Sequence, residues 1–107
     1  MPLSVRNLLE SASGSREEHL FPLLEQAGFR LERIVSNGAP SPAGFWYDQE
    51  SAEWVALLAG HATLEFEDGP LMLRAGDCLL IPPHVRHRVA DVSADAVWLA
   101  LHFDTRS

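Results

Sequence analysis

The sequence predicts an all-β protein, a closed or double-sheet β fold with a short helical flank at its N-terminus. From residue 29 onward, apolar segments of about four to eight residues alternate with turn signals roughly eight to twelve residues apart, a spacing typical of β-sandwiches and barrels. Before residue 29 the apolar residues recur at helical spacing. We therefore divide the chain into a helical flank, residues 1–28, and a β domain, residues 29–107.

The helical flank is predicted from a start signal, a periodic segment and a stop signal. Ser15 and Glu18 are spaced as a capping box, in which the serine hydroxyl accepts a hydrogen bond from the glutamate amide. Gly28 is the stop. Pro22 lies too far into the helix for its first turn, so we expect a kink there. The residues at helical spacing are Leu20, Leu23, Leu24 and Ala27.

The β domain is predicted from apolar runs separated by glycine and proline. Residues 54–59 form a continuous apolar run, as expected of a strand buried on both faces, whereas residues 62–67 alternate between apolar and acidic side chains. Cys78 falls in an apolar run and is expected in the core. The expected strands cover residues 29–36, 45–48, 54–59, 62–67, 71–74, 78–81, 86–92 and 96–103.

Composition excludes several classes of protein. A chain of 107 residues has the size of one domain, and its formal net charge of −7 would repel a nucleic-acid backbone. No apolar run approaches the roughly 18 residues of a membrane span, and the first residues do not resemble a secretory leader. The single cysteine cannot form an internal disulfide. We expect a cytoplasmic protein without nucleic-acid or membrane partners.

The most informative stretch runs from Gly76 to Val89, and it predicts a strand, a bend and a second strand. Pro82 has no amide to donate to a ladder, so the first strand ends there, and His84 and His87 follow the bend. The spacing resembles the second motif of the cupin superfamily, G-x5-P-x-G-x2-H-x3-N. Gly76, Pro82 and His87 match this motif, whereas His84 stands in place of its second glycine and Asp91 in place of its asparagine.

The first cupin motif, G-x5-H-x-H-x3/4-E-x6-G, is degenerate in this chain. Glu53 and Gly60 match its second half, but both histidines are absent. One spacing puts Tyr47 and Gln49 in their places, and the other puts Trp46 and Asp48 there. The resemblance extends from residue 34 to residue 103. It implies a short, stand-alone, single-domain cupin, whose fold is a double-stranded β-helix, also called a jelly-roll barrel.

Strand parity suggests which side chains share the barrel interior. If Glu53 points inward, so does Val55, and if His87 points inward, so does Val89. The face of the last strand that carries His102 looks either into the barrel or away from it, and the sequence leaves both possibilities open. We take Glu53 and His87 as catalytic candidates. The other pocket candidates are Trp46, Tyr47, Val55, His84, Val89 and His102, with His84 expected at the surface or in a supporting position.

The resemblance also implies a candidate metal site. One divalent ion, Mn, Fe, Zn or Mg, would be held by Glu53 and His87 with Asp48 or Gln49. Loss of both first-motif histidines favours ions that prefer oxygen ligands. In a metal-free pocket, Glu53 and His87 would instead form an acid–base or hydrogen-bonding pair.

Three functions are consistent with these residues. The first is a metal-binding cupin that binds a small organic molecule and transforms it, because the resemblance implies dioxygenase-, isomerase- or epimerase-like chemistry. The second is a metal-free module that binds or senses a small ligand. The third is a structural dimer with a filled barrel. A homodimer is expected, because small cupins commonly pair and the apolar strand at residues 96–103 is predicted to lie near a sheet edge that needs cover.

Overall fold

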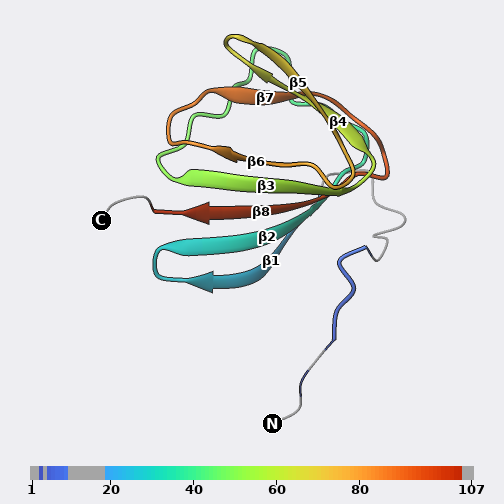
Figure 1. Ribbon diagram of the computed structural model, residues 1–107, viewed down its shortest axis with the longest axis vertical. Helices are drawn as coiled ribbons and strands as arrows, with labels where there is room; N and C mark the ends of the chain where they lie inside the picture. The colour runs from blue at the N-terminus through green and yellow to red at the C-terminus, as the bar shows by residue number, and fades with distance from the viewer. Residues whose placement is uncertain (1–2, 4, 10–18, 105–107) are drawn as a thin grey trace.

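The computed structural model describes residues 3, 5–9 and 19–104, and this part of the chain contains eight β-strands (Figure 1). No helix in it is long and apolar enough to span a membrane. The strands are β1 (His19–Gln26), β2 (Phe29–Val35), β3 (Ala52–Ala59), β4 (His61–Phe66), β5 (Gly69–Arg74), β6 (Cys78–Ile81), β7 (His87–Val92) and β8 (Val97–Phe103).

The strands form two antiparallel sheets that face each other as the two layers of a jelly roll (Figure 1). The larger sheet has the order β1-β2-β8-β3-β6, and the smaller has the order β5-β4-β7. Turns at positions such as Gly60, between β3 and β4, carry the chain from one sheet to the other. The predicted all-β jelly-roll architecture is confirmed.

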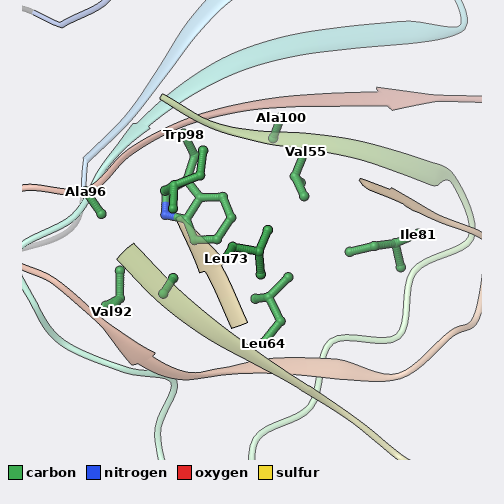
Figure 2. Close-up of a cluster of buried hydrophobic side chains, with 10 residues drawn as sticks. Val55, Leu64, Leu73, Ile81, Val92, Ala96, Trp98 and Ala100 are labelled. Carbon is green, nitrogen blue, oxygen red and sulfur yellow. The ribbon is translucent and has the colours of Figure 1, made fainter. Parts of the chain in front are cut away.

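The hydrophobic core lies between the two sheets (Figure 2). The larger sheet contributes Leu57 and Trp98, and the smaller contributes Leu64 and Leu73, all of them less than 10% exposed. Inward-facing positions alternate with outward-facing ones along each strand, which is why residues two apart in sequence meet in this cluster.

The predicted helix over the N-terminal flank is wrong for the described residues 19–26, which form the edge strand β1. Phe21 and Leu23 are partly buried while Leu20 and Leu24 are exposed, so the side chains follow the period of a strand. Pro22 is tolerated because β1 is an edge, and the pairing with β2 shifts register between Pro22 and Leu24. Pairing with β2 has therefore overridden a helical spacing of leucines. The capping box at Ser15 lies outside the described residues.

Two further expectations fail because of where strands lie in the larger sheet. Cys78 is exposed, because it lies on the outward face of the edge strand β6, whose inward residues Leu79 and Ile81 contact the core. β8 lies between β2 and β3 and is paired on both sides, so it is not at a sheet edge. The homodimer stays a prediction, but this reason for it does not hold.

Candidate functional site

Three rows of cross-strand neighbours on the inner face of the larger sheet build the candidate site. Residues opposite one another in an antiparallel ladder share a face, so the register fixes each row. The rows become less polar with depth. The outer row is Arg30, His102, Glu53 and Ile81; the middle row is Glu32, Ala100 and Val55; the inner row is Ile34, Trp98 and Leu57.

These rows and the smaller sheet enclose a cavity of about 230 Å³. Several of its apolar lining residues, such as Val55, Leu64 and Trp98, also belong to the core cluster (Figure 2). The cavity is therefore continuous with the core. Its apolar wall comprises Ile34, Val55, Leu64, Ile81, Val89 and Trp98. An apolar cavity with a few convergent polar groups is the usual form of a small-molecule site.

His87 is the polar group that the smaller sheet contributes. It begins β7, and its backbone pairs with Tyr47 through hydrogen bonds in both directions, of 2.7 and 3.1 Å. Its Nδ1 lies 2.9 Å from the Val85 carbonyl oxygen and donates to it, because a carbonyl can only accept. The Tyr47 ring stacks on the imidazole with centroids 5.3 Å apart. These contacts orient Nε2 toward Glu53.

A chain of four buried ionisable side chains crosses the cavity wall. Glu53 Oε1 lies 3.4 Å from His87 Nε2, and Glu53 Oε2 lies 3.7 Å from His102 Nε2. His102 Nε2 in turn donates to Glu32 Oε1 at 2.9 Å. All four side chains are less than 10% exposed by residue, so each depends on the others for polar partners. Glu53 is the link between the two imidazoles.

The pKa of His87 is raised above its ordinary value of 6.5. Burial disfavours the charged ring and lowers the pKa, but the hydrogen bonds to Glu53 and to the Val85 carbonyl, together with the negative charge of Glu53, raise it by more. The protonated ring can donate from Nε2 to Glu53, whereas the neutral ring would turn a lone pair toward the carboxylate. Protonation of His87 therefore stabilises its contact with Glu53.

The raised pKa predicts how stability depends on pH. A group whose pKa is higher in the folded state stabilises that state fully below its unfolded pKa and loses the contribution as pH rises through the folded pKa. The stability advantage of wild type over His87→Asn should thus shrink from pH 6 to pH 9, as measured by urea unfolding. His61→Asn, which changes an exposed histidine, should show a constant difference. An advantage that grows with pH would contradict the prediction.

Several residues singled out from the sequence do line the cavity. Glu53 and Val55 line it from β3, and His87 and Val89 line it from β7. His102 also lines the cavity, so the Trp98–His102 face of β8 is the one that looks inward. Of the two spacings of the degenerate motif, the one with Tyr47 and Gln49 brings its residues to the cavity.

Three other sequence candidates lie away from the cavity. Asp48 and Trp46 alternate with Tyr47 and Gln49, so their side chains point outward, where Trp46 packs under Arg86 with 5.3 Å from the guanidinium carbon to the ring centroid. His84 has φ 62°, the left-handed conformation for which the motif uses glycine, and its exposed ring bonds Asp48 at 2.7 Å. This outer pair joins the corner after β6 to the segment that carries Gln49.

Sequence reasoning missed the charged residues on β2. Arg30 and Glu32 line the cavity together with Ile34, three alternating positions on one face of the strand. The alternation was visible in the sequence, but both faces of β2 carry charged and apolar residues, so it did not reveal which face looks inward. Only the register with β8 places Glu32 beside His102.

The residues at the cavity do not fit a resident divalent ion in this arrangement. A metal ligand must present a lone pair, but the Nε2–H group of His102 donates a hydrogen bond to Glu32. Asp48 is engaged with His84 outside the cavity. Glu53, His87 and the amide of Gln49 then remain, and the described residues contain no group of three or more His, Cys, Asp or Glu side chains that could hold a metal ion.

The fold is a small jelly-roll barrel with a partly polar cavity between its two sheets. The family model described as a cupin domain matches residues 34–102. The chain therefore belongs to the cupin family, and the resemblance of its two motifs to that family is confirmed. No curated protein matches the chain significantly.

Solved structures agree with this assignment. A protein from Ralstonia eutropha JMP134, provisionally named a mannose-6-phosphate isomerase, is 44% identical with a TM-score of 0.87, and the match covers 96% of this chain and 100% of that one. An RmlC-like cupin from Desulfovibrio desulfuricans has 18% identity and a TM-score of 0.75, covering 95% and 97% of the two chains. KdgF from Halomonas sp. has 17% identity and a TM-score of 0.71, covering 88% and 86%. The last two share the fold alone.

Proposed function

We propose that the protein binds one small organic molecule in the cavity, with Glu53 and His87 as the groups that hydrogen-bond it and exchange protons with it. One observation carries the proposal: a buried carboxylate and imidazole 3.4 Å apart on the wall of an otherwise apolar cavity. Burying such groups costs free energy that packing alone does not require. Ionisable pairs of this kind in cavities are characteristic of functional sites.

The pair has the parts of an acid–base device. The Val85 carbonyl fixes Nδ1 of His87 as a donor, so any proton that His87 exchanges moves through Nε2. A ligand hydroxyl or carbonyl held beside Nε2 would accept that proton, while Glu53 would accept one from the ligand. His102 and Glu32 act as positioning residues, because their hydrogen bond holds the imidazole that faces Glu53 Oε2. The device needs no other group for proton transfer.

Binding should depend on both members of the pair. We expect Glu53→Gln and His87→Asn each to lower the affinity for the tightest-binding ligand by about tenfold, because each removes a charged partner from a buried hydrogen bond. Glu50→Gln removes an exposed carboxylate next to Gln49 and should leave affinity unchanged. The measurement is an NMR titration with a panel of small alcohols, hydroxy acids and sugars, followed through the indole signal of Trp98 in the cavity wall. Ile34→Phe, which fills the cavity, should abolish binding; binding that survives it would contradict the proposal.

A divalent ion in the cavity, which membership of the family suggests, is the alternative that metal analysis decides. Protein prepared without added metal should contain well below one Mn, Fe, Zn or Mg ion per chain. The contrary result would be one ion per chain that is lost in both Glu53→Gln and His87→Ala and retained in His61→Ala. The metal-binding function would then replace the metal-free one.

A second candidate function is isomerisation of a phosphorylated sugar, favoured by the name of the 44% identical protein. The Glu53–His87 pair suits the proton transfer that such a reaction needs. The wall of the cavity favours it less, because much of the wall is apolar and offers few partners to sugar hydroxyls. Interconversion of mannose 6-phosphate and fructose 6-phosphate by the purified protein, lost in Glu53→Gln, would establish it.

A further inference from the structure

Arg30 brings a guanidinium to the outer row of the cavity, where its only described carboxylate contact is a loose ion pair with Glu32. Of the described residues that line the cavity, it alone is permanently charged positive. Its Nε is buried and has no hydrogen-bond partner, and 43% of its side chain is exposed. The closest carboxylate oxygen, Oε2 of Glu32, lies 3.5 Å from Nε, outside good hydrogen-bond geometry. A guanidinium in this state is poised to receive an acceptor from elsewhere.

Glu32 does not satisfy this guanidinium, because its other oxygen already accepts from His102 at 2.9 Å. Arg88 also has a buried Nε without a hydrogen-bond partner, but both of its terminal nitrogens are bonded within the protein. One terminal nitrogen of Arg88 donates to Glu65 and the other to the Ser41 carbonyl, both at 3.0 Å. No described residue bonds the terminal nitrogens of Arg30 in this way. The fork of Arg30 is therefore free to bind an oxyanion with two parallel hydrogen bonds.

The other residues that line the cavity indicate which kind of organic group carries the oxyanion. Arg30 lies in the outer row, and the inner row ends at Trp98 and Ile34. A volume of about 230 Å³ holds a compact organic body of a few carbon atoms. A ligand that satisfies both ends has an oxyanion at Arg30 and an apolar end against Trp98.

We propose that the ligand is a small organic anion, a carboxylate or phosphate ester, whose charged group binds Arg30 and whose apolar end lies against Trp98. The inference rests on the proposed function, since it names the class of molecule that the same cavity takes. The negative groups that face Arg30 are Glu32 and Glu53, and the imidazoles that offset them are His87 and His102. A proton on His87 balances Glu53, so anion binding should take up protons and weaken at alkaline pH.

Three probes with one carbon skeleton test the charge requirement. They are 3-methylbutanoate, 3-methylbutyl phosphate and the uncharged 3-methylbutan-1-ol, each titrated at pH 6.5 and 9 while the Trp98 indole signal is recorded. At least one anion should bind tenfold or more tightly than the alcohol at pH 6.5, and the preference should shrink at pH 9. The better of the two anions distinguishes a carboxylate ligand from a phosphate ester.

Substitutions of Arg30 then locate the anion. Arg30→Gln should reduce anion affinity about tenfold or more and leave the affinity for the alcohol unchanged, and Arg30→Lys should recover only part of the loss because it lacks the fork. Arg74→Gln, the same change at an exposed arginine on β5, should have no effect. Circular dichroism and urea unfolding of each variant exclude misfolding as the cause.

Two outcomes would overturn the inference. Equal binding of the alcohol and both anions, or anion binding that survives Arg30→Gln, would remove the role of Arg30 while leaving a small-molecule cavity in place. Failure of all three probes to shift the Trp98 signal would count against the anion, and failure of the wider panel as well would count against the proposed function itself.

Discussion

Gly60→Ala should be strongly destabilising and lower the free energy of unfolding by about 2–5 kcal/mol. Gly60 has φ 80°, a conformation that costs an L-residue about 1–2 kcal/mol. A Cβ there would also collide with Ser93 Oγ and lie 2.8 Å from Ala96 Cα, and overpacking of this kind costs about 1–3 kcal/mol. Ser93 cannot move aside freely, because its hydroxyl accepts from the His61 amide at 3.0 Å.

Gly76→Ala is the matched control for this prediction. Gly76 has φ 98°, so the conformational penalty is similar, but no atom lies within 4 Å of the added Cβ. Urea unfolding should show Gly60→Ala to be worse by about 2 kcal/mol or more. Ser93→Ala added to Gly60→Ala should recover only part of the loss, since the contact with the Ala96 backbone remains. Equal losses at the two glycines would show that conformation alone, and not the close approach of the β3–β4 turn, requires glycine.

Leu57→Ala should lower the free energy of unfolding by about 2–5 kcal/mol, the cost of a cavity in a rigid core. The Leu57 side chain is 0% exposed, belongs to the core between the two sheets and lies opposite Trp98 in the β3–β8 ladder. Because the two sheets are rigid and closely packed, the neighbouring side chains cannot move far enough to fill the cavity that the substitution leaves.

Leu80→Ala is the control for this second prediction. Leu80 is 54% exposed on β6, so the same truncation should cost less than about 0.5 kcal/mol. Both variants are compared by urea unfolding at one pH. A small effect at Leu57 would mean that the core is loosely packed and that the neighbouring ligand cavity has flexible walls.

The sequence predicted the fold well because turn residues divide the chain at the right places. Asn37, Gly60 and Pro82 each lie outside the strands, just after the ends of β2, β3 and β6. It failed at β1, because leucines at residues 20 and 24 suit a helix as well as an edge strand. What decides between them is pairing with β2, a long-range contact that local spacing does not contain.

The candidate site was predicted in part. Strand parity predicted that Glu53 and His87 line one cavity, because inward-pointing side chains on two facing sheets both enter the space between the sheets. Two spacings remained open for Tyr47 and Gln49, because an irregular segment has no fixed period. Arg30 and Glu32 escaped notice because only the register between β2 and β8 reveals which face of β2 borders the cavity. The cavity itself, and so the class of ligand, depends on that register.

The irregularity at Pro22 also bears on self-association. An exposed sheet edge offers amides and carbonyls to any passing strand, and proteins protect such edges with proline and bulges. β1 carries both, because Pro22 has no amide and the register shifts before Leu24. A second copy therefore finds no uninterrupted template on this edge, which protects the chain against uncontrolled polymerisation. If the chain forms the expected homodimer, side-chain packing rather than a sheet continued across β1 should hold the two copies together.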